Sequence, residues 1–308
     1  MLCLRILVIC LMVIKGYNGY PATSHKATHG HSIPPVTRFS RPSKENIDSQ
    51  EIYLKIKSLA PEERQNAWEM SGLFEGDIME NKNVARNGLT DDEFRWPDGI
   101  VPVFINEDDF DQEDIAMIKA ALKEYHEKTC LRFRAYNEKD SDYVVFQGSE
   151  AGCWSSVGRQ GKEQVINLQN PGCMKHGTIV HEIMHAVGFY HQQSSFDRDE
   201  YVKIIWANIE KGKEHNFEKY DSNTVTDYGV GYDYQSVMHY SSKAFSKNGN
   251  MTIVPKKEDE IIGQRNGMSD KDMIKLGAMY NSECKKRDEK NDEEIITEIT
   301  DSLTWLFD

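Results

Sequence analysis

The 308-residue sequence lacks long apolar runs, and it lacks a basic stripe. The apolar run Ile6–Ile14 is too short to cross a bilayer, which takes about 20 residues, and no later stretch approaches that length. Lys and Arg number 37 against 50 Asp and Glu, so the net charge is −13. Because phosphate binding needs clustered basic residues, the sequence predicts a protein that neither spans a membrane nor binds nucleic acid.

Cysteine is also scarce, with six residues in the chain. Cys3 and Cys10 fall in the first 19 residues, where Arg5 precedes the short apolar run and small residues follow. This pattern is typical of a cleaved secretory signal, so we expect a secreted, extracellular protein. Four cysteines would remain, an even set that favours two disulfides with three possible pairings. They are Cys130, Cys153, Cys173 and Cys284.

The segment HEIMHAVGFYH, residues 181–191, has the spacing of a catalytic zinc site. His181 and His185 lie one helical turn apart and face the same way, with Glu182 beside them. Gly188 can adopt a positive φ and let the chain turn, so that His191 returns as a third nitrogen ligand. Three protein ligands leave a coordination position free for water, so the pattern predicts one catalytic Zn²⁺ per chain.

A second motif supports the same site. Residues Ser236–Tyr240 read SVMHY, which resembles the methionine turn of the metzincin proteases, and most closely that of the astacin family. The resemblance covers about Trp96 to Cys284. It extends over GCWSSVGR (Gly152–Arg159), CMKHGTIVHE (Cys173–Glu182), DRDEYV (Asp197–Val202) and IGQR (Ile262–Arg265).

The resemblance implies a role for each residue of the two motifs. Its three histidines, His181, His185 and His191, would ligate zinc, and Met238 would form an apolar floor, a role compatible with core packing. Glu182 would act as the general base, taking a proton from the zinc-bound water and delivering it to the leaving amine. Tyr240 would be a mobile extra ligand that later stabilises the oxyanion. His239 is interpreted as a structural histidine.

The implied fold is α+β, with an upper twisted sheet and two long helices above an irregular lower half that ends in a C-terminal helix. Substrate would lie extended along an edge strand of the upper sheet. The family pattern selects the disulfides Cys130–Cys284 and Cys153–Cys173. Periodicity predicts strands at 100–105, 131–134 and 143–146, and helices at 111–128, 178–187 and from a cap at Ser269 toward Tyr280.

The chain before the domain resembles a propeptide. Residues 74–77 read FEGD, and in this family the aspartate of that motif occupies the position of the water on zinc, so Asp77 is the expected latency switch. An ordinary turn is the alternative. Arg86 and Asn87 form the expected activation site for a trypsin-like protease. The predicted division is a signal at 1–19, a propeptide at 20–86, a catalytic domain at 87–284 and an acidic tail at 285–308.

Within the propeptide, residues 20–49 are rich in Pro, Ser, Thr and His, and are predicted to lack regular structure. A helix is expected to begin between Pro61 and Trp68. The tail could form a weak amphipathic helix, but a frayed, solvated end is favoured. No cysteine-rich module follows Cys284, so a minimal family member is expected.

Three positions concern details of specificity and processing. Gln192 stands where the family commonly has a glutamate that interacts with the freed N-terminus of the mature chain, so activation is expected to depend less on an accurate start at Asn87. Arg265 could favour an acidic residue after the scissile bond, or could be structural. Asn250 begins a glycosylation sequon beside Gly249.

The predicted function is a secreted zinc endopeptidase, made as a zymogen, acting as a monomer on protein or peptide substrates. A secreted binding protein that keeps the fold and the metal without turnover is the alternative. Glu182 separates the two, because a non-catalytic relative would be expected to lose this base first. An intracellular metal-binding regulator is opposed by the signal segment and the even cysteine set.

Overall fold

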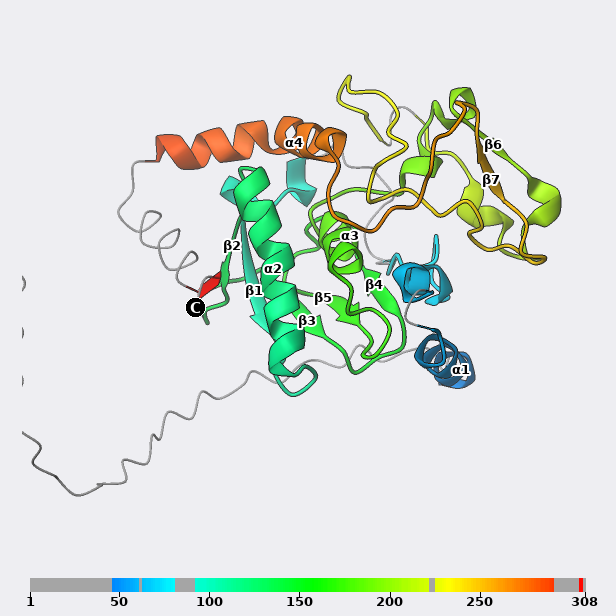
Figure 1. The fold of residues 1–308 in the computed structure, drawn as a ribbon. Helices are drawn as coiled ribbons and strands as arrows, with labels where there is room; N and C mark the ends of the chain where they lie inside the picture. The colour runs from blue at the N-terminus through cyan, green and yellow to red at the C-terminus, as the bar shows by residue number, and fades with distance from the viewer. Residues whose placement is uncertain (1–45, 61–62, 81–91, 222–224, 291–304, 307–308) are drawn as a thin grey trace, which may run out of the picture. The chain divides into compact units, whose positions relative to one another are not determined.

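The structure is a computed structural model that describes residues 46–60, 63–80, 92–221, 225–290 and 305–306 (Figure 1). The predicted signal and residues 20–45 of the predicted propeptide lie outside these residues. The same holds for Arg86 and Asn87. None of the described helices is long and apolar enough to cross a membrane.

The upper half is built on a five-stranded sheet with the order β2-β1-β3-β5-β4. All neighbouring strands are parallel except β4, which runs antiparallel to β5 at one edge. The strands predicted from periodicity are confirmed to within one residue at each end. The sheet consists of β1 (Ile100–Ile105), β2 (Arg132–Ala135), β3 (Tyr143–Gln147), β4 (Cys153–Ser155) and β5 (Glu163–Leu168).

Helices α2 (Gln112–Lys128) and α3 (His176–Ala186) both lie in front of this sheet in Figure 1 and pack against each other. Asp111 caps α2 by accepting hydrogen bonds from the Glu113 and Asp114 amides. Tyr125 is fully buried on α2, and its hydroxyl donates to the Val180 carbonyl of α3 at 2.7 Å. The pairing fixes α3 across the sheet.

The lower half has little regular structure before its C-terminal helix. A two-stranded antiparallel ribbon joins β6 (Val202–Ile204) to β7 (Ile253–Pro255). The described chain also contains short 3-10 segments, in both halves and in the segment before the sheet. They are η1 (Arg64–Met70), η2 (Asp92–Phe94), η3 (Pro97–Gly99), η4 (Gln192–Ser194), η5 (Arg198–Glu200), η6 (Trp206–Asn208) and η7 (Glu214–Phe217).

The C-terminal helix α4 (Asp270–Glu289) begins at the predicted cap, Ser269, but continues well past Tyr280. Its last turns, expected to belong to a frayed tail, are held because Arg287 is buried and donates to the Cys130 carbonyl at 2.8 Å. Near the chain end, Leu306 is also buried in the core. The tail prediction is therefore wrong for 285–289 and for this residue.

The predicted propeptide contributes α1 (Asn46–Lys57) and η1. Residues 20–49 were predicted to lack regular structure, so the start of α1 at Asn46 corrects that boundary. The helix expected between Pro61 and Trp68 is a 3-10 segment. Its Ala67 and Trp68 are fully buried in the main hydrophobic core. Part of the predicted propeptide is therefore packed into the domain.

Both disulfides have the pairing that the family resemblance implied. Cys130, just after α2, is joined to Cys284 on α4. Cys153 on β4 is joined to Cys173, three residues before α3. The second bridge therefore ties the edge of the sheet to the start of the helix that carries the first two motif histidines.

Candidate active site

Helix α3 ends immediately after the second motif histidine, and its end has the hydrogen bonds of a Schellman motif. Gly188 has a φ of 117° and its amide donates to the His185 carbonyl at 2.7 Å. The Phe189 amide donates to the Met184 carbonyl at 3.0 Å. The left-handed turn redirects the chain so that His191 comes back beside the helix, as the glycine predicted.

The three histidines converge with Asp77 in the interior. Asp77 Oδ2 lies 2.9 Å from His181 Nε2, and Asp77 Oδ1 lies 3.4 Å from His185 Nε2 and 3.3 Å from His191 Nε2. All four side chains are buried. One ligand atom of each lies within 4.8 Å of the others. The sequence separation between Asp77 and the histidines is more than a hundred residues, so folding alone creates this group.

The opposite ring nitrogens are each held by another group. His181 Nδ1 faces the Val237 carbonyl at 2.8 Å, and His185 Nδ1 faces the Phe189 carbonyl at 2.6 Å. His191 Nδ1 faces a carboxylate, Glu75 Oε2, at 2.8 Å. With Nδ1 donating in each ring, the three Nε2 atoms are left as acceptors that point toward Asp77.

This arrangement fits a zinc ion. His185 Nε2 and Asp77 Oδ1 are buried, and neither has a hydrogen-bond partner among the described residues. Three imidazole nitrogens and one carboxylate oxygen are a donor set that zinc commonly takes, with four ligands. Buried polar atoms that converge without partners are otherwise costly, so a cation would satisfy them.

Glu182 lies next to His181 on α3 and is fully buried. Within the described part of the chain, neither of its carboxyl oxygens has a hydrogen-bond partner. Burial raises the pKa of Glu182 well above its usual value, and the nearby Asp77 carboxylate raises this pKa further, while Arg265 lowers it. A metal cation in the site acts in the same direction as Arg265.

The methionine-turn residues lie on the other side of His191. The Met238 side chain is in the core, and its carbonyl accepts from the Gln192 amide at 3.0 Å. The Tyr240 ring centroid is 4.7 Å from that of His191, and its hydroxyl donates to the Glu75 carbonyl at 2.6 Å. His239 bonds to the Tyr232 hydroxyl and the Tyr240 carbonyl, consistent with a structural role.

Side chains of the predicted propeptide fill the space around this group. The Trp68 ring stacks on His181, with 4.7 Å between centroids, and on His191, with 5.1 Å. The Arg265 guanidinium also lies over the Trp68 ring, 4.8 Å from the ring centroid. Glu69 Oε1 accepts from the Ser241 amide at 3.2 Å. Sequence reasoning missed Trp68 and Glu69, because no motif marks them.

The predicted propeptide also pairs with the edge strand β4. The Ser155 amide donates to the Asp77 carbonyl at 3.0 Å, and the Met79 amide donates to the Ser155 carbonyl at 2.9 Å. Ser71 Oγ donates to the Cys153 carbonyl at 2.8 Å and accepts from the Cys153 amide at 2.9 Å. Residues 71–79 thus line the strand edge along which substrate was expected to lie.

Two further predicted positions are Arg265 and Asn250. Arg265 donates to the Val237 carbonyl and to the His239 carbonyl, each at 3.1 Å, so it also braces the methionine turn. Asn250 is exposed in the loop before β7, where a glycan is accessible, and glycosylation there stays a prediction.

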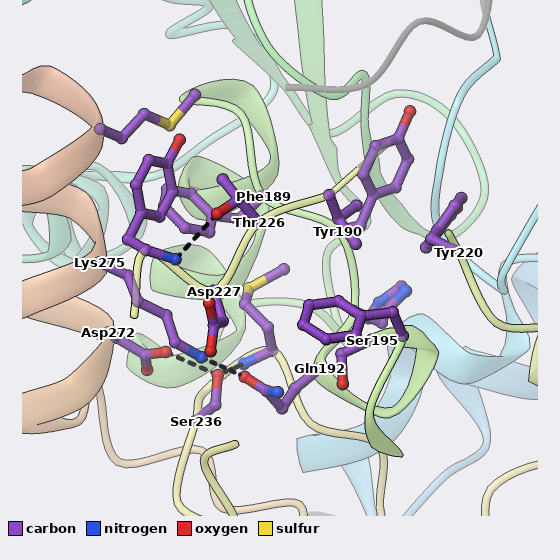
Figure 2. Close-up of a pocket in the computed structure, with 16 residues that line it drawn as sticks. Phe189, Tyr190, Gln192, Ser195, Tyr220, Thr226, Asp227, Ser236, Asp272 and Lys275 are labelled. Carbon is purple, nitrogen blue, oxygen red and sulfur yellow. Dashed lines mark hydrogen bonds between the residues drawn. The ribbon is translucent and has the colours of Figure 1, made fainter. Parts of the chain in front are cut away.

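A cavity, drawn in Figure 2, is lined in part by His191, Met238 and residues of α4. Lys275 of α4 is buried and donates to the Gln192 side-chain carbonyl at 2.7 Å. Burial lowers the pKa of Lys275, whereas Asp272 and Asp233 raise it. The amide at position 192 is therefore already bonded to an internal amine.

A family model described as Astacin (Peptidase family M12A) matches residues 88–281. The chain belongs to the astacin family. Over 213 residues it is 42% identical to the zinc metalloproteinase nas-7 of Caenorhabditis elegans, covering 69% of this chain and 55% of that protein. Over 213 residues it is 41% identical to human meprin A subunit beta, covering 68% of this chain and 30% of that protein.

A solved astacin-family relative supports the fold. High choriolytic enzyme 1, a hatching enzyme zinc-protease from the medaka Oryzias latipes, aligns with a TM-score of 0.56 and 33% identity, covering 67% of this chain and 99% of that one. The chain spans about half, or less, of the length of the two curated relatives. The matched region is an astacin zinc metalloproteinase domain, and one zinc ion is the family's cofactor.

Proposed function

We propose that the protein is a secreted zinc endopeptidase, synthesised as a zymogen whose propeptide blocks the active site. The observation that carries the proposal is the contact of Asp77 with all three motif histidines in a buried site. A carboxylate at this point would exclude the attacking water and keep the precursor silent. The two disulfides support an oxidising, extracellular compartment.

His181, His185 and His191 would hold the zinc, and Asp77 would complete its ligands in the precursor. When bound, zinc supplies a Lewis acid that polarises the scissile carbonyl and lowers the pKa of the attacking water. Glu182 takes a proton from this water as its oxygen bonds to the carbonyl carbon. The same carboxyl then delivers the proton to the amide nitrogen as the C–N bond breaks.

Tyr240 has a second task. In the precursor its hydroxyl donates to the Glu75 carbonyl. Removal of residues 68–79 would free this hydroxyl to donate to the oxyanion that develops on the scissile carbonyl. The propeptide therefore withholds an oxyanion donor from the site as well as covering it.

The deciding experiment measures peptidase activity of the secreted protein on a protein digest before and after limited trypsin treatment. Activity should appear after cleavage near Arg86 and should fall by about 10²–10⁴-fold in Glu182→Ala, in line with the loss of a general base. A zinc chelator should abolish it. Clean processing and one bound zinc without turnover would instead establish the binding-protein alternative.

We also propose that Arg265 gives a preference for an acidic residue after the scissile bond. The propeptide places Glu69 near Arg265, and each of the two charges shifts the pKa of the other group. Profiling of cleavage sites should show Asp or Glu enriched there, and Arg265→Lys should weaken the enrichment. A flat profile in the wild-type enzyme would leave Arg265 with its structural role alone.

For Gln192 we propose that the Lys275 amine supplies the positive charge inside the cavity that Gln192 and Lys275 line. Catalysis would then not need the freed N-terminus beside Gln192. Two residues added before Asn87 should therefore leave peptidase activity within about twofold. Lys275→Met in the same extended protein should reduce activity, because Gln192 loses its buried partner. A large loss from the extension alone contradicts the proposal.

A further inference from the structure

The three motif histidines differ in which part of the chain holds their second ring nitrogen. His181 and His185 are held by carbonyls of Val237 and Phe189, which belong to the catalytic domain. His191 is held by the carboxylate of Glu75, which belongs to the propeptide. Removal of the propeptide therefore takes away the partner of one ring and leaves the other two rings with theirs.

Glu75 is built into this position by several contacts. Its side chain is buried, with Oε2 at 2.8 Å from His191 Nδ1 and Oε1 accepting from Ser194 Oγ at 3.0 Å. Its carbonyl accepts from the Tyr240 hydroxyl. The backbone has a φ of 47°, a left-handed conformation that is uncommon for glutamate. Such a conformation persists where surrounding contacts enforce it.

A carboxylate in this position acts on the metal through the imidazole. It fixes the tautomer with Nδ1 protonated and keeps the ring oriented. It also makes Nε2 a more basic ligand for the cation. It also adds a second negative charge, besides Asp77, near a doubly charged ion in a buried site. Partners of this kind change metal affinity by about 10–100-fold when they are mutated.

We propose that Glu75 is a positioning residue for His191, and that through it the propeptide makes the precursor bind zinc more tightly than Asp77 and the three histidines would achieve alone. The propeptide would then have two tasks, blocking the cleft and retaining the metal until processing. This inference rests on the proposed zinc site and assigns to Glu75 a function separate from the latency of Asp77.

The test measures zinc dissociation constants of the full-length precursor by competition with a chromogenic chelator. Glu75→Gln keeps the size of the side chain and a neutral acceptor, and should weaken zinc binding about 10-fold. Glu75→Ala should weaken it further, toward 100-fold. The control is Glu51→Gln, an exposed glutamate of α1, which should bind zinc as the wild type does.

A spectroscopic measurement separates positioning from loss of folding. In ¹⁵N-histidine-labelled, zinc-loaded precursor, the ring N–H proton of His191 should resonate downfield because its acceptor is a carboxylate, and should move upfield in Glu75→Gln. The ring N–H signals of His181 and His185 should stay in place. Processed protein from both precursors has the same sequence and should bind zinc equally.

One result would overturn the role of Glu75, and another would overturn the proposed zinc site. Equal zinc affinity in wild type, Glu75→Gln and Glu75→Ala, with unchanged ring signals, would overturn the role of Glu75 while the zinc peptidase stands. A wild-type precursor that takes up no zinc, with His191→Ala behaving identically, would overturn the proposed zinc site itself.

Discussion

At the scale of the residue, the start of α3 depends on the absence of a side chain. Gly177 is the second residue of this helix, and a Cβ there would lie 2.0 Å from the Arg265 carbonyl oxygen. The clash is with backbone, which cannot swing aside as a side chain can. Gly177 thus sets how closely the helix with the first two histidines approaches the loop that carries Arg265.

Gly177→Ala should therefore destabilise the precursor by about 1–3 kcal/mol, since the loop or the helix must shift. Chemical denaturation of the zinc-loaded protein measures the difference. Gly277→Ala is the matched control, because Gly277 is helical and a Cβ there meets nothing within 4 Å. That change should be neutral or stabilising by up to about 1 kcal/mol. Equal behaviour of the two variants would refute the argument.

Individual site residues could be predicted where the spacing itself carries the chemistry. His181, His185 and His191 needed only a helix and a glycine turn to be placed together. Trp68 could not be predicted, because stacking on a histidine pair depends on tertiary packing and leaves no periodic signal. The contact of Glu75 with His191 had a partial signal, since Glu75 lies inside the FEGD segment, but its direction is set by a backbone conformation that the sequence does not reveal.

At the scale of the element, Glu124 joins three segments. Its carboxylate accepts from Lys128 at 3.0 Å on its own helix, from the Met268 amide at 2.9 Å before α4, and pairs with His176 at the start of α3. Burial raises the pKa of Glu124, but these hydrogen bonds outweigh it and lower the pKa to about 2. The charged form is therefore favoured by the folded state.

A lowered pKa gives stability that is fully present above the unfolded value near 4.5 and is lost as the pH falls through about 2. Glu124→Gln should therefore cost about 1–2 kcal/mol at pH 7, after allowance for solvent screening, and much less near pH 2. Urea denaturation at both pH values measures this. Glu127→Gln, whose partner Lys123 is 3.7 Å away on the surface, should show little pH-dependent difference.

Elements with strong local signals were predictable, and those fixed by distant contacts were not. The Ser269 cap marked the start of α4 because a capping side chain acts within three residues, and the apolar periodicity marked the start of α2. The end of α4 depends on Cys130 and Arg287, which act across the fold, so the charged sequence after Cys284 suggested a frayed tail instead.

At the scale of the whole molecule, part of the predicted propeptide lies in the domain's interior. Trp68 is fully buried against the histidines, Tyr240 and Arg265. Burying a tryptophan contributes several kcal/mol, comparable with the net stability of a domain. The proposed inhibition and the packing would therefore share the same contacts, so weakening one should weaken the other.

On the proposed latency mechanism, Trp68→Ala should loosen the predicted propeptide and give measurable peptidase activity in protein that has not been cleaved. The loss of packing, about 3–5 kcal/mol, should raise the open population by more than 100-fold. Peptide hydrolysis by protein verified as intact measures the effect. Trp206→Ala, at a half-exposed tryptophan of the domain, is the control and should stay silent. A silent Trp68→Ala precursor would show that Asp77 suffices for latency.

The contacts of residues 68–79 with the domain have a consequence for the timing of activation. Each described contact is non-covalent, and none uses the bond between residues 86 and 87. On the proposed zymogen mechanism, cutting that bond would leave the excised segment seated as a bound inhibitor until it dissociates. Activity should follow cleavage with a lag, dilution should favour release, and the freed peptide should act as a reversible competitive inhibitor when added back.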